Sequence, residues 1–233
     1  MAGPFDLSGP LLAPAAGGRA RELVIMLHGY GADGRDLIGL APHWAPALPH
    51  AAFVAPNAPF PCEAAPYGYQ WFSFADRDPA MVLGGVRAAA AVLQGFIAGE
   101  LGERGLGEDR LALVGFSQGA MMALHVAPRR IRAAAAVVGY SGALVGPDQL
   151  ASEIRSRPPV LLVHGDADSV VPFAELGAAA AALDSAGLKV TAVARPGLAH
   201  GIDEAGLALG GRFIADAFVA AGGGPARVGE APE

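Results

Sequence analysis

Short apolar runs alternate along this chain with longer segments of helical spacing, and this alternation limits the fold more than any other feature. The short runs, several of which stop at glycine, predict buried strands. They cover residues 23–27, 51–54, 110–114, 133–138, 160–163 and 189–194, although the alanines of 133–138 leave a helix as a rival there. Helices are expected at 36–44, 81–103, 117–127, 173–185 and 203–221. A repeated β-α order predicts an α/β fold, a mostly parallel sheet with helices on both faces, whose sites lie at the carboxyl ends of the strands.

Length and composition fit one domain. The 233 residues are 53% hydrophobic and 16% charged, enough to fill a sizeable core, so a single domain over 1–233 is expected. The Gly- and Pro-rich start, residues 1–20, is predicted to lie on the surface, and residues 222–233 to form a flexible tail.

Charge, cysteine usage and hydropathy exclude several classes. A net charge of −6 argues against a nucleic-acid partner, and the lone Cys62 excludes an internal disulfide framework and a multi-cysteine zinc site. No uncharged apolar run reaches the roughly 18 residues needed to span a bilayer, and no secretory signal is recognisable, so no membrane span and a cytoplasmic location are expected.

The run Gly115-Phe116-Ser117-Gln118-Gly119 joins a predicted strand directly to a predicted helix. This setting is typical of a nucleophile elbow, in which a tight turn projects a serine from the sheet edge and glycines two residues away avoid clashes. An ordinary Gly-rich turn is the alternative, because the motif alone is weak. The run Gly139-Tyr140-Ser141-Gly142-Ala143 nearly matches this motif, but it lacks the second glycine two residues after the serine. Ser141 is therefore interpreted as a loop residue.

Chain order indicates the partners of Ser117. In this fold the acid and then the histidine follow the serine, and only His164 and His200 come later with an acidic residue between. His200, on a loop past the last strand, is the better placed general base. Asp166 and Asp168 both follow the strand at 160–163, and the residues alone leave the choice of acid open.

A tetrahedral intermediate also needs two N–H donors. The residue after the nucleophile, Gln118, supplies one, and the Tyr30 backbone N–H after the first strand is the choice for the other. His28 is expected to brace that loop. The histidines lack metal-ligand spacing, so neither a metal nor a cofactor is predicted.

Between residues 59 and 79 the chain is irregular and rich in aromatic side chains. A loop this long is uncommon in a compact domain unless it has a role. It either lines the substrate cavity or forms a small packed core of its own, and the sequence does not separate the two readings.

Four motifs together resemble the phospholipase/carboxylesterase family of α/β hydrolases. They are the run from Leu27 to Gly34, the run from Gly115 to Ala120, His164-Gly165-x-x-Asp168-x-Val170-Val171-Pro172, and His200-Gly201-Ile202. The resemblance implies the α/β-hydrolase fold and a triad of Ser117, Asp168 and His200, and it agrees with Tyr30 and Gln118 as oxyanion donors. It also implies that Trp71 and Phe72 lie beside the acyl site and that the chain can form a homodimer. Many members carry leucine where this chain has Tyr30, which should alter the mouth of the pocket.

The expected function is therefore hydrolysis of small to medium carboxylic esters through an acyl-enzyme on Ser117, with a small-molecule ester as the substrate. An acyl-protein thioesterase or a lysophospholipase would use the same triad and is the alternative. A hydrolase-fold protein that binds a ligand without turnover is a remote third reading.

Overall fold

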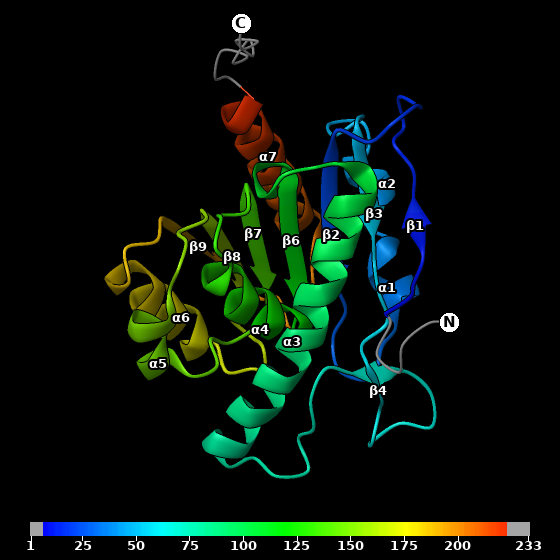
Figure 1. Ribbon diagram of the computed structural model, residues 1–233. Helices are drawn as coiled ribbons and strands as arrows, with labels where there is room; N and C mark the ends of the chain where they lie inside the picture. Colours follow the sequence, from blue (N-terminus) through cyan, green and yellow to red (C-terminus); the bar gives the residue numbers. More distant parts are fainter. Residues whose placement is uncertain (1–6, 223–233) are drawn as a thin grey trace, which may run out of the picture.

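The computed structural model describes residues 7–222. Its centre is a seven-stranded sheet in the order β1-β3-β2-β6-β7-β8-β9 (Figure 1). The strands are β1 (Leu11–Leu12), β2 (Glu22–Leu27), β3 (Ala51–Val54), β6 (Leu111–Phe116), β7 (Ala136–Tyr140), β8 (Val160–Gly165) and β9 (Val190–Arg195). All neighbouring pairs are parallel except β1 and β3, which are antiparallel. The predicted mostly parallel sheet is confirmed.

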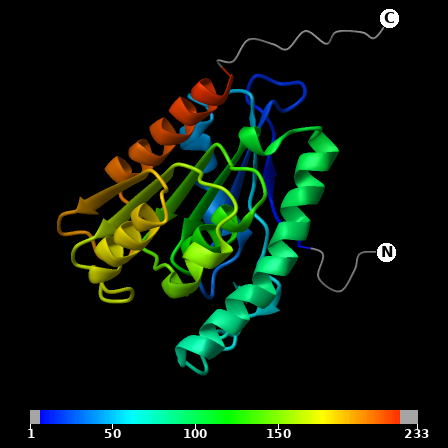
Figure 2. The ribbon, with the colours of Figure 1, turned by 60° about the vertical axis from the view of Figure 1, so that its left-hand side comes forward.

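Helices cover both faces of this sheet (Figure 2). One side holds α3 (Pro79–Arg104), α4 (Gln118–Val126), α5 (Pro147–Glu153) and α6 (Ala174–Ser185); the other holds α1 (Gly34–Ile38), α2 (Ala41–Trp44) and α7 (Glu204–Gly222). Two short 3-10 helices, Glu108–Arg110 and Ala127–Arg129, complete the helical segments of residues 7–222. Alternate residues of β2 enter opposite cores: Leu23, Ile25 and Leu27 pack toward α3 and α4, and Val24 and Met26 pack toward α2 and α7.

Two sequence expectations need correction. The segment 36–44, expected as one helix, is split into α1 and α2, because Gly39 ends the first and Pro42 stands in the first turn of the second. The start of the chain lies mostly on the surface as expected, but Leu11 and Leu12 also pair with β3 as an edge strand. The tail predicted at 222–233 lies outside the described residues except for Gly222, which ends α7.

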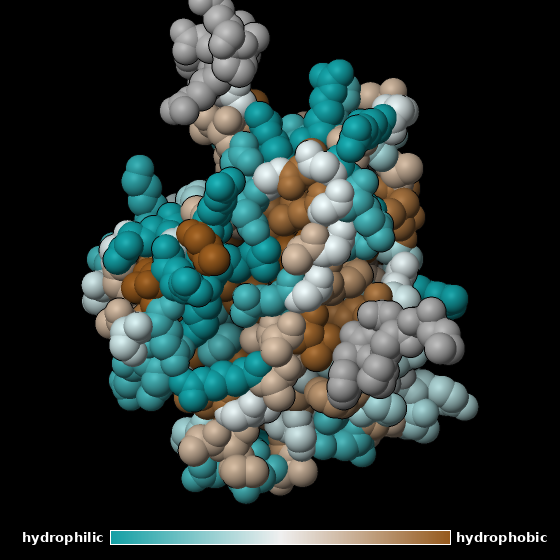
Figure 3. All heavy atoms as spheres, viewed as in Figure 1, coloured by the Kyte–Doolittle hydropathy of each residue, from teal (hydrophilic) through white to brown (hydrophobic). Residues whose placement is uncertain are grey.

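By length and hydropathy alone, α3 and α7 are apolar enough to cross a membrane. The uncharged-run criterion used on the sequence misses them because each contains a few charged residues. Both helices bury one face against the sheet. The exposed face of α3 is largely Ala and Gly, and α3 is visible as a pale diagonal band on the molecular surface (Figure 3). The large apolar side chains of α3, such as Val86, Leu93 and Ile97, are buried, so the exposed face is much less apolar than the helix as a whole.

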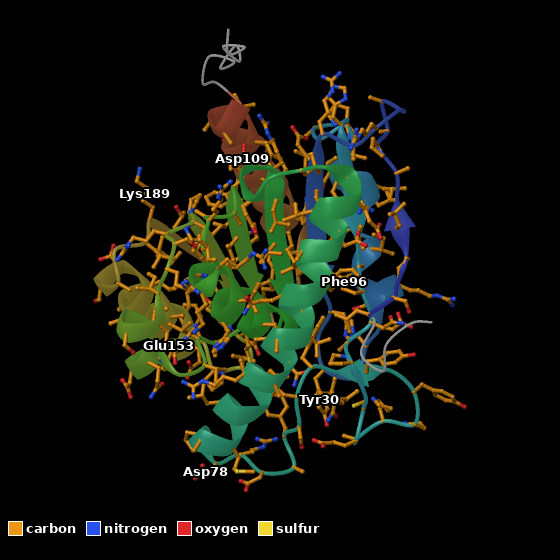
Figure 4. The ribbon with its side chains drawn as sticks, viewed as in Figure 1. Tyr30, Asp78, Phe96, Asp109, Glu153 and Lys189 are labelled. Atoms are coloured by element: carbon orange, nitrogen blue, oxygen red, sulfur yellow. The ribbon has the colours of Figure 1, made fainter. Side chains whose placement is uncertain are left out.

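The strand order reverses between β2 and β6, because β3 follows on one side of β2 and β6 on the other. In open α/β sheets the crevice at the carboxyl ends of such a strand pair is the usual ligand site. The segment 60–78 lies at this end and includes a small ribbon of β4 (Phe60–Pro61) and β5 (Tyr69–Gln70). Figure 4 places Tyr30 and Asp78 at this end, and Asp109 and Lys189 at the other.

Candidate active site

Ser117 occupies the sharp turn between β6 and α4. Its backbone has φ +52° and ψ −116°, a left-handed conformation that non-glycine residues rarely adopt. The turn is held by a hydrogen bond of 2.9 Å from the Ser117 N–H to the Tyr140 carbonyl. A Cβ on Gly115 would overlap the backbone of Gly119, and a Cβ on Gly119 would overlap the Leu27 carbonyl. The predicted reason for both glycines, close backbone approach, is what the structure shows.

His200 lies on the loop after β9 and contacts the loop after β8. Its Nδ1 is 2.7 Å from Oδ2 of Asp168. The other oxygen of Asp168, Oδ1, accepts the N–H groups of Val170 and Val171 at 2.8 and 3.0 Å. Burial raises the pKa of Asp168, but the hydrogen bonds from His200, Val170 and Val171 outweigh it and hold the pKa below its usual value. Asp168 is thus an ionised partner for His200.

Asp166, the other acid left open by the sequence, points elsewhere. Its Oδ1 accepts the Gly197 N–H at 2.6 Å in an exposed turn. It therefore braces the turn that leads to the His200 loop and makes no bond to the imidazole.

His200 lies close to Ser117 because its ring packs against Phe116, the residue before the serine. The Phe116 and His200 ring centroids are 4.8 Å apart, so the imidazole lies beside the strand end that carries the serine. The hydrogen bonds found among residues 7–222 do not include one between Ser117 and His200. Such bonds are often long in unliganded hydrolases and tighten when substrate binds.

The loop after β2 lies against the elbow. Leu27 and Gly115 are paired in the parallel ladder, and a Cβ on Gly29 would come within 3.4 Å of the Ser117 Cβ. The Gln118 N–H is at the start of α4, where it has no acceptor inside the helix, and the Tyr30 N–H is absent from the backbone pairs found in residues 7–222. Both amides are therefore available to a ligand beside Ser117.

His28 braces this loop, as the sequence predicts. Its Nδ1 is 2.7 Å from the Gly29 carbonyl oxygen, and its Nε2 accepts the Ala58 N–H at 2.9 Å. The proton must therefore reside on Nδ1. Burial lowers the pKa of His28, although the Gly29 carbonyl and two nearby carboxylates oppose the shift, so the imidazole is neutral and structural.

The side chain of Gln118 has a role that the sequence did not reveal. It is fully buried, its Oε1 accepts the Trp71 N–H at 2.8 Å, and its Nε2 donates to the Phe72 carbonyl at 2.8 Å. The Trp71 indole also donates to the His28 carbonyl at 3.0 Å. These bonds fasten the aromatic loop to the elbow.

A cavity of about 630 Å³ opens beside Ser117. Its walls are mostly apolar, with charged residues among them: Tyr30, Glu63, Ala64, Phe74, Ala75, Arg77, Val82, Ser117, Met121, Ala143, Val170, Val171, Pro172 and Glu175. This volume is within the range of pockets for small organic ligands.

Trp71 and Phe72, expected to line the substrate site, are not part of this wall. Both are almost completely buried in the core between the sheet and α3. Phe74, from the same loop, and Tyr30 line the cavity instead, with ring centroids 5.5 Å apart. Part of the aromatic loop therefore packs in the core and part lines the cavity. The correction is that Phe74, and not Trp71 or Phe72, faces the cavity.

The Glu63 carboxylate accepts hydrogen bonds from several residues of the cavity wall and its surroundings. The sequence did not predict this role of Glu63. The carboxylate accepts Ser73 Oγ at 2.6 Å, the Phe74 N–H at 2.8 Å, the Tyr30 hydroxyl at 3.2 Å and Gln70 Nε2 at 3.3 Å. Bonds from Ser73 and Phe74, reinforced by those from Gln70 and Tyr30 against a smaller opposing effect of burial, lower the pKa of Glu63 to about 2. Glu63 is therefore ionised at neutral pH.

Ser141 and Cys62, which the sequence analysis also considered, are both buried. Ser141 is buried with φ +47°, and its hydroxyl donates to the Gly201 carbonyl at 3.4 Å, next to His200. Cys62 is buried near Gly31. Within residues 7–222, no group of three or more His, Cys, Asp or Glu is arranged to hold a metal ion.

Comparisons with known proteins decide the family. The family model described as Phospholipase/Carboxylesterase matches residues 14–217. The chain belongs to the phospholipase/carboxylesterase family. It is 31% identical over 185 residues to "Esterase YpfH" of Escherichia coli strain K12, covering 79% of this chain and 78% of that protein. It is 28% identical to "Acyl-protein thioesterase 1" of Neurospora crassa, covering 82% of this chain and 84% of that protein.

Among solved structures, the crystal structure of esterase PE8 has a TM-score of 0.87 and 42% identity, covering 91% of this chain and 99% of that one. These findings confirm the expected α/β-hydrolase fold and the expected class of activity, hydrolysis of carboxylic esters.

Proposed function

We propose that Ser117, Asp168 and His200 form the catalytic triad of this carboxylic ester hydrolase, with the Tyr30 and Gln118 N–H groups as the oxyanion hole. The observation that carries the proposal is the left-handed backbone of Ser117 at the start of α4. A strained residue costs on the order of 1–3 kcal/mol, and such strain is concentrated at functional sites. Two contacts of His200 support the same assignment: its ring lies against Phe116, the residue before the serine, and its Nδ1 is paired with Asp168.

The chemistry follows from which atoms are free. Because His200 Nδ1 is engaged by Asp168, Nε2 is the atom that takes the Ser117 proton while Oγ attacks the ester carbonyl. The oxyanion that forms accepts the two N–H groups. When the C–O bond breaks, His200 returns the proton to the departing alcohol oxygen and the acyl group remains on Ser117. Water then attacks the acyl-enzyme, with His200 again as the base. When the bond between the acyl carbon and Ser117 Oγ breaks, His200 returns the proton to Oγ and the carboxylic acid is released.

The proposed substrates are small to medium carboxylic esters. The support is the size of the cavity and the mostly apolar wall that Phe74, Val82 and Met121 contribute beside Ser117. The rival substrate, an acyl thioester on a protein, uses the same chemistry, and the Neurospora crassa relative is named "Acyl-protein thioesterase 1".

Kinetics on p-nitrophenyl esters from acetate to palmitate test the substrate class. We expect kcat/KM to be highest for short to medium chains. A maximum at palmitate, or faster cleavage of an acyl thioester than of the matching ester, would instead support the thioesterase reading. No turnover of any ester, thioester or lysophospholipid would favour a binding protein.

Ser117→Ala tests the triad. The variant should lose at least about 10³-fold in kcat and all labelling by a fluorophosphonate. Ser141→Ala is the matched control, because Ser141 also has left-handed backbone but is proposed to act only in its loop. Labelling that persists in Ser117→Ala and disappears in Ser141→Ala would show that the elbow is misassigned.

The homodimer, the cytoplasmic location, the single-domain organisation and the absence of a cofactor stay predictions. Light scattering on the purified chain measures the first of these directly.

A further inference from the structure

Asp168 has a second histidine beside it. His164 lies near the end of β8 with only 2% of its side chain exposed. Its Nε2 is 3.2 Å from Asp168 Oδ2, the same oxygen that His200 Nδ1 approaches at 2.7 Å. Nε2 is also 3.0 Å from the Val171 carbonyl oxygen. The proposed triad uses His200 and leaves His164 without a role.

The surroundings of His164 determine where its proton resides. Both atoms near Nε2 are acceptors, an ionised carboxylate oxygen and a carbonyl oxygen, so Nε2 carries the hydrogen. Nε2 donates that hydrogen to the Val171 carbonyl, with Asp168 Oδ2 also 3.2 Å away. Elsewhere the ring meets Phe173 at 6.2 Å and a small apolar space between α4, β7, β8 and α6. That space is lined by Ala120, Leu124, Gly139, Gly142, Leu162, Leu176 and Ala179. Among these neighbours Asp168 is the charged group that faces the ring.

Three hydrogen bonds hold the Asp168 carboxylate, from Val170 and Val171 at Oδ1 and from His200 at Oδ2. His164 Nε2 lies 3.2 Å from Oδ2 and bonds the carbonyl of Val171, the residue whose N–H holds Oδ1. The side chain is 0% exposed, so water does not replace a donor that is removed. Hydrogen bonds to a buried carboxylate are worth more than those between neutral groups, and each fixes its orientation.

We propose that His164 is a positioning residue of the active site, which orients the Asp168 carboxylate toward His200 and takes part of its negative charge. The inference rests on the proposed triad. It assigns the histidine of the His164-Gly165-x-x-Asp168 motif a role in the reaction that does not require contact with substrate.

Removing the His164 donor has two consequences. The Val171 carbonyl loses its bond from His164, so the Val171 N–H holds the carboxylate less firmly. The His200 imidazole is then less well aligned for proton transfer, and kcat falls. At the same time Oδ2 loses a polar N–H 3.2 Å away, so Asp168 stabilises a protonated imidazole more strongly. The acid limb of the kcat/KM profile, where activity falls as His200 is protonated, therefore moves to higher pH.

Three variants test this on a p-nitrophenyl ester that the wild-type chain cleaves. His164→Leu removes the donor. His164→Gln retains an N–H near the position of Nε2. His125→Gln is the control, because His125 is an equally buried histidine on α4 whose described contacts do not include the triad.

For His164→Leu we expect kcat to fall by roughly 10-fold with KM within about twofold, and the acid limb to rise by about 0.5 to 1 pH unit. His164→Gln should recover most of kcat and return the limb toward wild type. The downfield ¹H NMR resonance of the proton between His200 and Asp168 should shift in His164→Leu and not in His125→Gln.

Unchanged kcat, acid limb and NMR resonance in folded His164→Leu would overturn the inference. So would a loss in both His164 variants that follows thermal stability alone, without movement of the limb or the resonance. Asp168→Asn and His200→Ala separate this result from a failure of the proposed function. If either retains full activity, the triad is wrong; if both are inactive while His164→Leu is normal, only the role of His164 is wrong.

Discussion

Gln118 offers the sharpest test of how the aromatic loop is attached to the elbow. Replacing it with methionine, which has a similar volume, removes both bonds of the side chain and leaves the backbone N–H of Gln118 in place. The Trp71 N–H and the Phe72 carbonyl would then be buried without partners. Each such group costs about 1–3 kcal/mol, so Gln118→Met should destabilise the fold by roughly 2–6 kcal/mol. That is a large share of the 5–15 kcal/mol typical of a domain.

Urea unfolding followed by tryptophan fluorescence measures this loss. Gln94→Met on α3 is the control, because Gln94 is only half-buried and the change should stay within about 0.5 kcal/mol. In Gln118→Met the fluorophosphonate should still label Ser117, while ester hydrolysis falls because Phe74 loses its fixed position. A loss of stability no larger than that of the control would refute the reasoning. It would mean that the loop is held by its other contacts, such as the Trp71 indole bond and the backbone bonds of Tyr69, and not by these two bonds.

Three further changes are predicted. Gly119→Ala should lower the unfolding free energy by at least about 2 kcal/mol and Tm by roughly 5 °C, because the new Cβ meets the Leu27 carbonyl, while Gly95→Ala, in open space, should not destabilise; equal Tm values would contradict the close approach. Glu63→Ala should reduce kcat/KM by roughly 10- to 100-fold without abolishing Ser117 labelling, because the cavity wall loses its shared acceptor; unchanged ester kinetics would argue against it. Burial, reinforced by nearby Arg129, lowers the pKa of His125 to about 4, so protonation of the unfolded chain below pH 6.5 should cost up to about 3 kcal/mol of stability by pH 4, a loss that denaturant titrations should find smaller in His125→Gln.

The sequence predicts the sheet well because most of its strands are continuous apolar runs buried on both faces. It misses β1, since two leucines in a Gly- and Pro-rich segment have no pattern of their own and pair with β3 only through tertiary structure. The break at 36–44 was also missed, because apolar spacing does not register a proline in the first turn of a second helix.

The candidate site divides in the same way. Ser117 and His200 follow from a motif and from chain order, which are local signals. The choice between Asp166 and Asp168 needs the direction of each side chain, and spacing alone does not supply it. The buried positions of Trp71 and Phe72, and the bonds that Glu63 and the Gln118 side chain make, depend on how residues far apart in the chain are brought together.

Two of the anchors of the aromatic loop, the Gln118 amide and the Glu63 carboxylate, have a consequence for engineering. The Gln118 amide holds the backbone of Trp71 and Phe72, and the Glu63 carboxylate holds Ser73 and the Phe74 backbone. Neither anchor uses the Phe74 side chain or the residues at 64–67. These positions can therefore be substituted while the two anchors keep the rest of the loop in place. A library that varies them and keeps both anchors should sample new cavity shapes while the catalytic geometry stays intact.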